Sequence, residues 1–223
     1  MTQKTHLAFV VNTAAYFISH RLPIAIAALE RGYSIDLYTG AAASPAREQA
    51  AVAELSRYPI THWRVKFTSA ARIPLSEGAA IWALARRLGS RLPALLHGET
   101  PEGVLYGGIA ARLARVPTFV AAISGADGQF GSPGMPAQPQ NGRGGGTIGM
   151  RFALGHRNKH VIVQTCDDRQ YFVRSKLALP AQLSLIPNFD AIGNPDSRQD
   201  GMHATAARAI TLYGELLARA AAS

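Results

Sequence analysis

The sequence predicts a single α/β domain in which helices cover both faces of a doubly wound, mainly parallel sheet. Short apolar runs typical of buried strands alternate along the chain with longer stretches whose apolar residues recur at helical spacing. Such alternation is typical of βα units, in which each helix crosses over between two parallel strands. The clearest unit spans residues 7–40, where an apolar run, a polar turn, a helical pattern and a second apolar run follow one another.

Composition and length fit a globular protein with a sizeable core. The chain has 223 residues, of which 48% are hydrophobic and 17% are charged. No apolar run reaches the roughly 18 residues of a membrane span, and Asn12 interrupts the first apolar run too early for a secretory signal. The single Cys166 excludes an internal disulfide, so we expect a protein of the reducing cytoplasm.

A strongly basic balance, with a net charge of +9 and a sequence pI of about 10.2, favours an anionic partner. Phosphates, membrane surfaces and nucleic acids belong to that class, and a basic solvated surface without a partner is the alternative. Small basic clusters stand at residues 86, 87 and 91 and at residues 151, 157 and 159. No interleaved aromatic residues accompany them, so we expect no nucleic acid as a partner.

The first helical pattern lies between the first two predicted strands. Its apolar residues form one stripe: Ile18, Leu22, Ala25, Ala28 and Leu29. We expect Ser19 as the N-cap, because serine suits that position and Pro23 then falls in the first turn, where proline is tolerated. Gly32 is placed to end the helix.

The remaining elements follow the same rhythm. Further strands are predicted at residues 33–38, 60–67, 94–97, 118–123, 160–164 and 183–186. Helices are predicted at residues 45–57, 76–92, 103–115, 150–155 and 167–177. Inside one of these helices, Gly107 and Gly108 each cost roughly 1 kcal/mol relative to alanine, which favours close helix–sheet packing over ligand contact.

Two stretches lack the content of a packed element. Residues 126–149 are rich in Gly, Pro and Gln and predict a flexible loop, since they cannot bury enough apolar surface to order themselves. Their glycines do not form a phosphate-binding P-loop, because the lysine and the preceding strand are missing. Residues 188–201 have the composition of a linker. An Ala-rich helix follows at residues 202–223, and one of its sides is apolar: Ala206, Ile210, Tyr213, Leu216 and Leu217.

Three segments carry a more specific signal. They are VVNTAAYFISHRLPIAIAALERGYSIDLYT, HGETPEGVLYGGIAARLARVPTFVAAISG and VIVQTCDDRQYFVRSKLALPAQLSLIPN. In order and at suitable spacing, they resemble the N-terminal Rossmann-like domain of family-four-like glycosyltransferases, which are GT-B enzymes of surface-polysaccharide assembly. The resemblance implies transfer of a sugar from a nucleotide diphosphate to an acceptor hydroxyl, usually with retention and without a bound metal or other cofactor.

The resemblance also implies a division of labour between two domains. The N-terminal domain of such enzymes holds mainly the acceptor, and the C-terminal domain holds the nucleotide-sugar with a pair of glutamates seven residues apart. No glutamate stands between Glu102 and Glu215, so that pair has no counterpart here. The tail resembles the last helix of these enzymes, which crosses back onto the first domain. We therefore expect a domain at residues 1–187 joined to a terminal helix, with the donor domain deleted between about residues 188 and 201.

Several partners and functions follow as expectations. The resemblance implies three kinds of partner. The first is a saccharide or polyprenyl-phosphate-linked acceptor, and the second is an anionic surface at the inner membrane face. The third is a donor-domain subunit or a second copy of the chain. Nucleotide-sugar binding by this chain alone is expected to be weak or absent. A non-catalytic remnant or interaction module is the alternative, as is the acceptor-binding subunit of a split enzyme. An unrelated nucleotide-binding protein is disfavoured, because no Gly-rich fingerprint follows the first strand.

Candidate site residues follow from the rule that ligands bind outside the carboxyl ends of strands in open α/β sheets. After the first strand come Asn12 and Thr13, followed by His20 and Arg21 in the first helical pattern. The resemblance places this turn beside the interdomain cleft, although the glycine pair of many relatives is missing. An ordinary capped turn is the alternative.

The fourth predicted strand is followed by a second group, His97, Glu99 and Thr100. A histidine beside a glutamate can share a proton with it or orient a sugar hydroxyl. A buried imidazole that is hydrogen-bonded to the backbone is the alternative for His97.

A third group, Ser124, Gly125 and Asp127, follows the fifth predicted strand. Many relatives carry a histidine where Ser124 stands, and this departure leaves the catalytic residues unassigned. Asp127 is either a substitute for that histidine or a turn former.

Two other groups of polar residues have structural explanations. Asp167 and Asp168 suit the start of a helix. His156 and His160 have no third ligand in reach, so we predict no metal site there.

Overall fold

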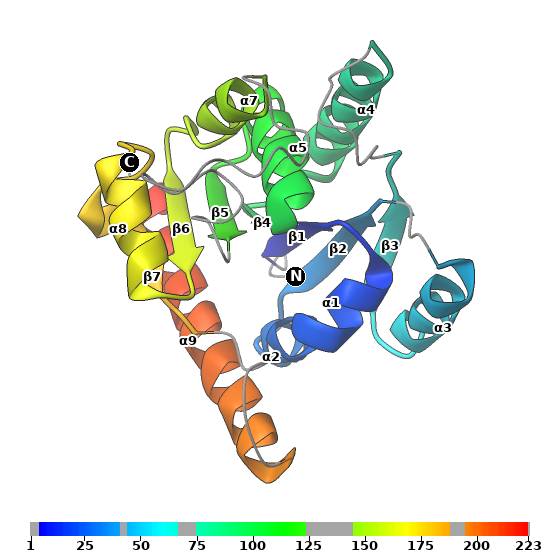
Figure 1. Cartoon of the computed structure of the whole chain (residues 1–223). Helices are drawn as coiled ribbons and strands as arrows, with labels where there is room; N and C mark the ends of the chain where they lie inside the picture. The colour runs from blue at the N-terminus through cyan, green and yellow to red at the C-terminus, as the bar shows by residue number, and fades with distance from the viewer. Residues whose placement is uncertain (1–4, 41–43, 67–74, 124–144, 188–194, 223) are drawn as a thin grey trace.

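One parallel sheet organises the chain. The computed structural model describes residues 5–40, 44–66, 75–123, 145–187 and 195–222. Seven parallel strands in these ranges pair in the order β3-β2-β1-β4-β5-β6-β7 (Figure 1). The strands are β1 (His6–Val11), β2 (Ser34–Thr39), β3 (Ile60–Arg64), β4 (Leu95–Glu99), β5 (Thr118–Ile123), β6 (Lys159–Val163) and β7 (Leu183–Leu185). The predicted doubly wound parallel sheet is therefore confirmed, and its strand order reverses at β1, between β2 and β4.

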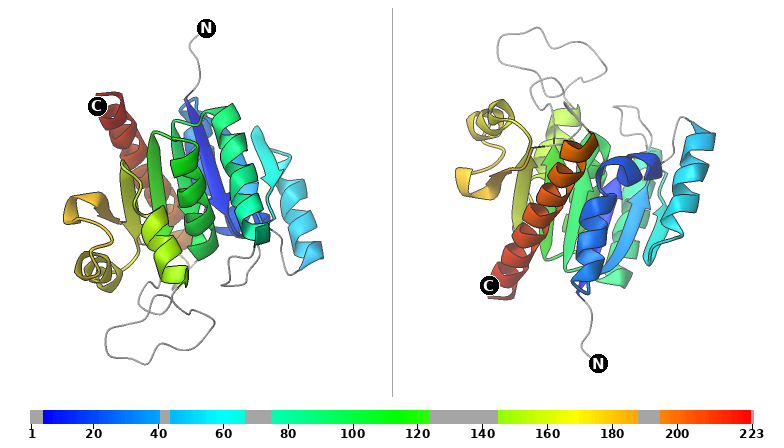
Figure 2. Two further views of the ribbon diagram at one scale, coloured as in Figure 1. Left: turned by 90° about the horizontal axis from the view of Figure 1, so that it is seen from above. Right: turned by 90° about the horizontal axis from the view of Figure 1, so that it is seen from below.

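Helices cover both faces of the sheet, as the two views of Figure 2 show. One face carries α1 (Ala14–His20), α2 (Leu22–Glu30), α3 (Pro45–Leu55) and α9 (Pro195–Ala221). The other face carries α4 (Leu75–Arg91), α5 (Thr100–Leu113), α7 (Gly145–Ala153) and α8 (Cys166–Arg174). A short 3₁₀ turn, η1 (Pro180–Gln182), precedes β7. The terminal helix α9 packs beside α2, which confirms that it returns to the sheet.

The strands alternate between two buried cores. In β1, Phe9 belongs to the core under α1, α2 and α9, while Val10 belongs to the core under α4, α5 and α7. Successive strand residues point to opposite faces, and both faces of this sheet are covered. The strands therefore appear in the sequence as continuous apolar runs, because neither face needs polar residues.

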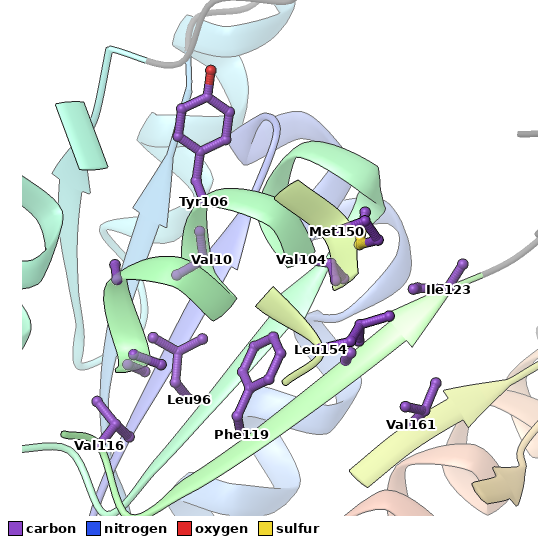
Figure 3. Close-up of a cluster of buried hydrophobic side chains, with 14 of the residues drawn as sticks. Val10, Leu96, Val104, Tyr106, Val116, Phe119, Ile123, Met150, Leu154 and Val161 are labelled. Atoms are coloured by element: carbon purple, nitrogen blue, oxygen red, sulfur yellow. The ribbon is translucent and has the colours of Figure 1, made fainter. Parts of the chain in front are cut away.

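Helix α5 packs closely on β1 and β4. Figure 3 shows side chains of this core, among them Val104 of α5, Val10 of β1 and Leu96 of β4. A Cβ atom on Gly103 would lie 2.3 Å from the Val10 carbonyl oxygen, so only glycine fits there. Further along α5, a Cβ atom on Gly108 would lie 2.8 Å from the Ala153 Cβ and 3.0 Å from the Phe119 ring. The packing explanation for the glycines in this helix is confirmed.

The first helical pattern forms two helices instead of one. Thr13 caps α1, because its Oγ1 accepts a hydrogen bond from the Tyr16 amide at 3.1 Å. Ser19 lies inside α1 and donates its hydroxyl proton to the Ala15 carbonyl at 2.9 Å, so the predicted N-cap is wrong. The break falls at Arg21, since Pro23 near the start of α2 has no amide proton to continue the ladder.

Two predicted boundaries are also wrong, both because a helix begins earlier than its composition suggests. Helix α7 begins at Gly145, inside the predicted loop at residues 126–149, because Met150 and Ala153 bury themselves beside α5. Helix α9 begins at Pro195, inside the predicted linker at residues 188–201, where proline suits the first helical position. The rest of that loop and of that linker, residues 126–144 and 188–194, lies outside the described residues.

None of the helices that the structure describes combines the length and apolar character that crossing a bilayer requires.

Candidate functional site

A buried ion pair lies at the carboxyl edge of the sheet, where the strand order reverses. Arg21 stands between α1 and α2, and Glu99 is the last residue of β4. The Arg21 Nε donates a short hydrogen bond to Glu99 Oε1, and the Tyr16 hydroxyl donates to Glu99 Oε2 at 3.3 Å. The side chains of Arg21 and Glu99 are only 7% and 2% exposed. Both oxygens of this carboxylate are therefore occupied by groups of the same chain.

The ion pair decides the charge state of Glu99. Burial opposes ionisation, but the Arg21 charge and the contact with His97 outweigh it and lower the pKa of Glu99 to about 2. Although burial lowers it, the pKa of Arg21 is raised above its ordinary value by Glu99. Glu99 is therefore a carboxylate at neutral pH, and it accepts hydrogen bonds without donating any.

His97 extends this pair to the terminal helix. Its Nδ1 forms a short hydrogen bond with the Tyr213 hydroxyl of α9. Its Nε2 lies 3.0 Å from Glu99 Oε1, although the two atoms lack hydrogen-bonding alignment. Burial raises the pKa of Tyr213 well above its ordinary value, so that hydroxyl keeps its proton. Of the two explanations for His97, the structure agrees with a buried imidazole, which is 1% exposed, but its hydrogen-bond partner is a tyrosine instead of the backbone. A role in sharing a proton or orienting a sugar hydroxyl stays a prediction.

A cavity of about 20 Å³ adjoins these side chains, and it has room for about one water molecule. Besides Arg21, His97 and Glu99, its lining includes Gln164, directly after β6, and Thr205 of α9. Gln164 is half-buried, and its amide group is the type that hydrogen-bonds hydroxyls. Sequence reasoning missed both residues. The strand-end rule would have found Gln164 if it had been applied to β6.

Thr100 lies beside this site in a strained conformation. Its φ of 62° is in the left-handed region, which costs a non-glycine residue of order 1–3 kcal/mol. Gly103 packs directly against the backbone of β1 and so holds α5 close to the strand. The chain must therefore turn sharply at Thr100. Thr100 Oγ1 accepts a long hydrogen bond of 3.4 Å from the Gly103 amide, and so helps to cap α5.

A buried carboxylate occupies the turn after β1. Glu48 of α3 is 1% exposed, and its two oxygens accept the amide protons of Ala14 and Ala15 at 3.0 and 3.2 Å. Dinucleotide-binding sheets hold a pyrophosphate at this turn. In this chain the Glu48 carboxylate binds the amides of that turn instead. The glycines that such a pyrophosphate site needs are also missing. No sequence signal marked Glu48, because it stands in the first turn of a mostly exposed helix.

The other predicted site residues have separate positions. Thr13 serves as a helix cap, and the Asn12 Oδ1 is buried without a hydrogen-bond partner in the described structure. His20 lies in the last turn of α1, where its ring centroid is 4.5 Å from that of Tyr16. The residues after β5, which are Ser124, Gly125 and Asp127, lie outside the described residues.

The two aspartates of α8 lie in its first turn, where they suit the helix dipole, but the cap is Thr165. Its Oγ1 accepts the Asp168 amide proton at 3.0 Å. Within the described ranges, no three His, Cys, Asp or Glu side chains come close enough to hold a metal ion.

Comparison with solved structures identifies proteins of similar fold. A glycosyltransferase from Rickettsia africae ESF-5 matches 90% of this chain and is matched over 48% of its own length, at 13% identity and a TM-score of 0.54. MurG from Acinetobacter baumannii matches 87% of the chain over 47% of its own length, at 13% identity and a TM-score of 0.52. The chain thus spans about half the length of these two proteins.

A structure of sucrose-phosphate synthase from Thermosynechococcus elongatus matches 95% of the chain over 98% of its own length, at 13% identity and a TM-score of 0.56. At such low identity these likenesses show the fold alone. Comparison with curated proteins found no match. The sequence itself matches the family described as "Glycosyl transferase 4-like domain" over residues 22–188. The chain therefore belongs to the glycosyl transferase 4-like domain family, and it has the Rossmann-like fold of a GT-B glycosyltransferase domain.

Proposed function

We propose that this chain supplies the acceptor-binding half of a glycosyltransferase and works with a donor-binding domain from another polypeptide. The observation that carries the proposal is the polar network of Arg21, His97 and Glu99 at the strand-order reversal, where open α/β sheets bind ligands. Membership of the glycosyl transferase 4-like domain family supports sugar transfer as the reaction.

The arrangement of the chain supports a missing donor domain. The sucrose-phosphate synthase structure is matched over 98% of its own length, so a chain of this extent forms the same fold. In this chain a helix from a distant part of the sequence, α9, packs beside α2 on the parallel sheet. The nucleotide-sugar site then belongs to the second polypeptide, and this chain alone binds nucleotide-sugars weakly or not at all.

The acceptor is a saccharide or a polyprenyl-phosphate-linked sugar of surface-polysaccharide assembly. Gln164 and Thr205, beside the network, offer an amide and a hydroxyl to sugar hydroxyls. The exposed face of α4 supports a peripheral position at an anionic membrane surface. Trp82 is 59% exposed there, and Arg86, one turn further on, is also exposed.

The reaction constrains what the second polypeptide must provide. Transfer breaks the bond between the anomeric carbon and the diphosphate oxygen, forms a bond from that carbon to the acceptor oxygen, and releases the hydroxyl proton. Glu99 already accepts hydrogen bonds from Arg21 and Tyr16, and its pKa of about 2 makes it a poor base. We infer that the acceptor proton leaves to a group outside the described part of this chain.

Binding and transfer assays test the proposal together. A saccharide array and short-chain polyprenyl-phosphate sugars identify an acceptor, and calorimetry then compares Gln164→Ala with the exposed control Gln170→Ala. We expect about five- to tenfold weaker binding for the first variant and no change for the second. Sugar transfer should require a separately expressed donor-domain protein. Micromolar nucleotide-sugar binding by the chain alone, or no transfer with any candidate donor domain, would count against the proposal.

A non-catalytic interaction module is the second candidate. The observation that favours it is the small cavity of about 20 Å³ beside side chains that already bond one another. A remnant of this kind binds a partner protein and no sugar. Light scattering after size-exclusion chromatography, combined with pull-downs, discriminates between the two, because a monomer that binds a saccharide and captures no protein would exclude the module.

A further inference from the structure

A second, larger pocket opens at the amino edge of the sheet, opposite the network of Arg21 and Glu99. Its volume is about 480 Å³, which lies within the range of ligand-binding pockets. Its walls are the end of α5, the connection from α7 to β6 and, through Ala220, the end of α9. Three arginines line it: Arg112, Arg115 and Arg157. The described lining contains no Asp or Glu.

Histidine and asparagine side chains hold the wall of this pocket in place. His156 Nε2 lies 2.9 Å from the Val116 carbonyl, and the Asn158 amide donates to His156 Nδ1 at 3.2 Å. A carbonyl only accepts and an amide proton is only donated, so this imidazole is neutral with its proton on Nε2. The Asn158 side chain also donates to the Pro117 carbonyl at 3.3 Å. These bonds tie residues 156–158 to the start of β5, and the wall is formed before any ligand arrives.

Arg112 is held by contacts with other residues in the described part of the chain, whereas Arg115 and Arg157 are not. The Arg112 guanidinium donates to the Phe152 carbonyl at 2.6 Å and lies 4.0 Å from the centre of the Phe152 ring. Arg115 and Arg157 are exposed, and within the described ranges their side chains have no hydrogen-bond or ion-pair partner. Burial lowers the pKa of His156, and the positive charges of Arg112 and Lys159 lower it further. The described lining of the pocket therefore carries positive charge without an Asp or Glu beside it.

We propose that this pocket binds a soluble small ligand that carries a diphosphate, with Arg115 and Arg157 as the residues that grip it. A guanidinium presents a planar set of donors that matches phosphate oxygens, and two exposed guanidinium groups beside this wall can bind adjacent phosphate groups. Arg112, which is held by Phe152, adds positive charge to the pocket. This pocket is separate from the proposed acceptor site. Binding of a diphosphate there would account for part of the basic charge of the chain.

A competing explanation has a different outcome. Arg112 and Arg115 lie near the end of α5, where positive charge offsets the helix dipole. If that were their whole role, replacing them would lower the stability of the protein and leave its response to anions unchanged.

Calorimetric titration with inorganic pyrophosphate at constant ionic strength tests the site. The double variant Arg115→Gln and Arg157→Gln is compared with the double variant Arg169→Gln and Arg208→Gln, which removes the same charge from two exposed positions in α8 and α9 outside the pocket lining. We expect the first variant to raise the dissociation constant about tenfold or more and the second to change it less than twofold. Thermal unfolding should show that both variants remain folded.

Three outcomes of the pyrophosphate titration would overturn the proposal. They are absence of pyrophosphate binding to the unaltered chain, equal weakening in both double variants, and a loss of stability in the first variant without any weaker binding. A parallel arm with phosphatidylglycerol vesicles identifies the source of the phosphate. Vesicle binding that depends on Arg115 and Arg157 without binding of soluble pyrophosphate would assign these residues to a lipid surface, and would also overturn the proposal.

Discussion

The Tyr213 hydroxyl of α9 hydrogen-bonds the His97 imidazole of β4, across 116 residues of sequence. This bond joins α9 to the buried pair of Arg21 and Glu99, so one network contacts three separate parts of the chain. The terminal helix is therefore attached to the candidate site by a polar contact as well as by its apolar stripe.

Replacing Tyr213 with phenylalanine should lower the free energy of unfolding by about 1–3 kcal/mol, because His97 Nδ1 is then buried without a partner. Urea unfolding measures the change. The half-buried Tyr58 offers a matched control, and Tyr58→Phe should stay within about 0.5 kcal/mol. Equal effects of the two variants would mean that the Tyr213 hydroxyl contributes nothing.

Replacing Glu99 with glutamine should destabilise the protein by about 3–5 kcal/mol, since it leaves the Arg21 charge buried without its counter-ion. The folded-state pKa of about 2 lies below the ordinary value of 4.5, so the Glu99 contribution is complete above pH 4.5 and is lost as the pH falls toward 2. The exposed Glu30→Gln is the control. Urea midpoints between pH 2.5 and 6 should fall more steeply for the unaltered protein than for Glu99→Gln.

The contact between His6 and Asp36 predicts a pH dependence of stability opposite to that of Glu99. Nε2 of His6 lies 3.3 Å from Asp36 Oδ2, and this contact raises the pKa of His6 although partial burial lowers it. The His6 contribution is therefore complete below its unfolded pKa of about 6.5 and is lost as the pH rises through the higher folded value. His6→Gln should flatten the loss of stability above pH 6.5. An unchanged slope would show that His6 does not titrate with folding.

Shortening Glu48 should show how much its two hydrogen bonds to α1 stabilise the fold. Glu48→Ala leaves the amides of Ala14 and Ala15 without their acceptor and should cost about 2 kcal/mol or more. Glu48→Gln keeps one acceptor oxygen, so its cost should be smaller. The order of the two variants in a urea titration is the measurement, and identical losses would contradict the hydrogen-bond explanation.

Helical glycines offer a test with opposite signs. Gly108→Ala would place a Cβ atom 2.8 Å from the Ala153 Cβ, and overpacking of this kind costs about 1–3 kcal/mol. Gly89→Ala meets nothing within 4 Å and should stabilise α4 by about 0.5–1 kcal/mol. Thermal unfolding of the two variants should shift in opposite directions, and a parallel shift would refute the packing explanation for Gly108.

The sheet could be predicted from the sequence because its strands are buried on both faces. Residues 118–123 form β5 as predicted, since an apolar run between polar neighbours fits a central strand well. Helix starts were harder to predict. The glycines that open α7 and the Pro195 that opens α9 have low helix propensity, and packing of later residues in those helices decides where they begin.

The site was predictable only as far as it follows strand ends. Their positions in the sequence made Arg21, His97 and Glu99 candidates, but their mutual contacts could not be predicted, because those depend on how the turns fold back. Tyr213 was expected in the apolar stripe of the last helix, and its burial is confirmed. Its hydrogen bond to His97 could not be predicted from the sequence. A tyrosine ring packs in an apolar stripe whether or not its hydroxyl joins a polar network.

The late position of α9 in the sequence has a consequence for synthesis. The face of β5 and β6 that holds Val120 and Ile162 is covered by α9, through residues such as Ile210 and Tyr213. Until the ribosome has made those residues, the nascent chain exposes an apolar sheet surface and a buried-type ion pair to water. Contacts of such long sequence separation form slowly, and partly folded chains with exposed apolar surface aggregate. The emerging chain is therefore most prone to aggregate until α9 has left the exit tunnel and covered this surface.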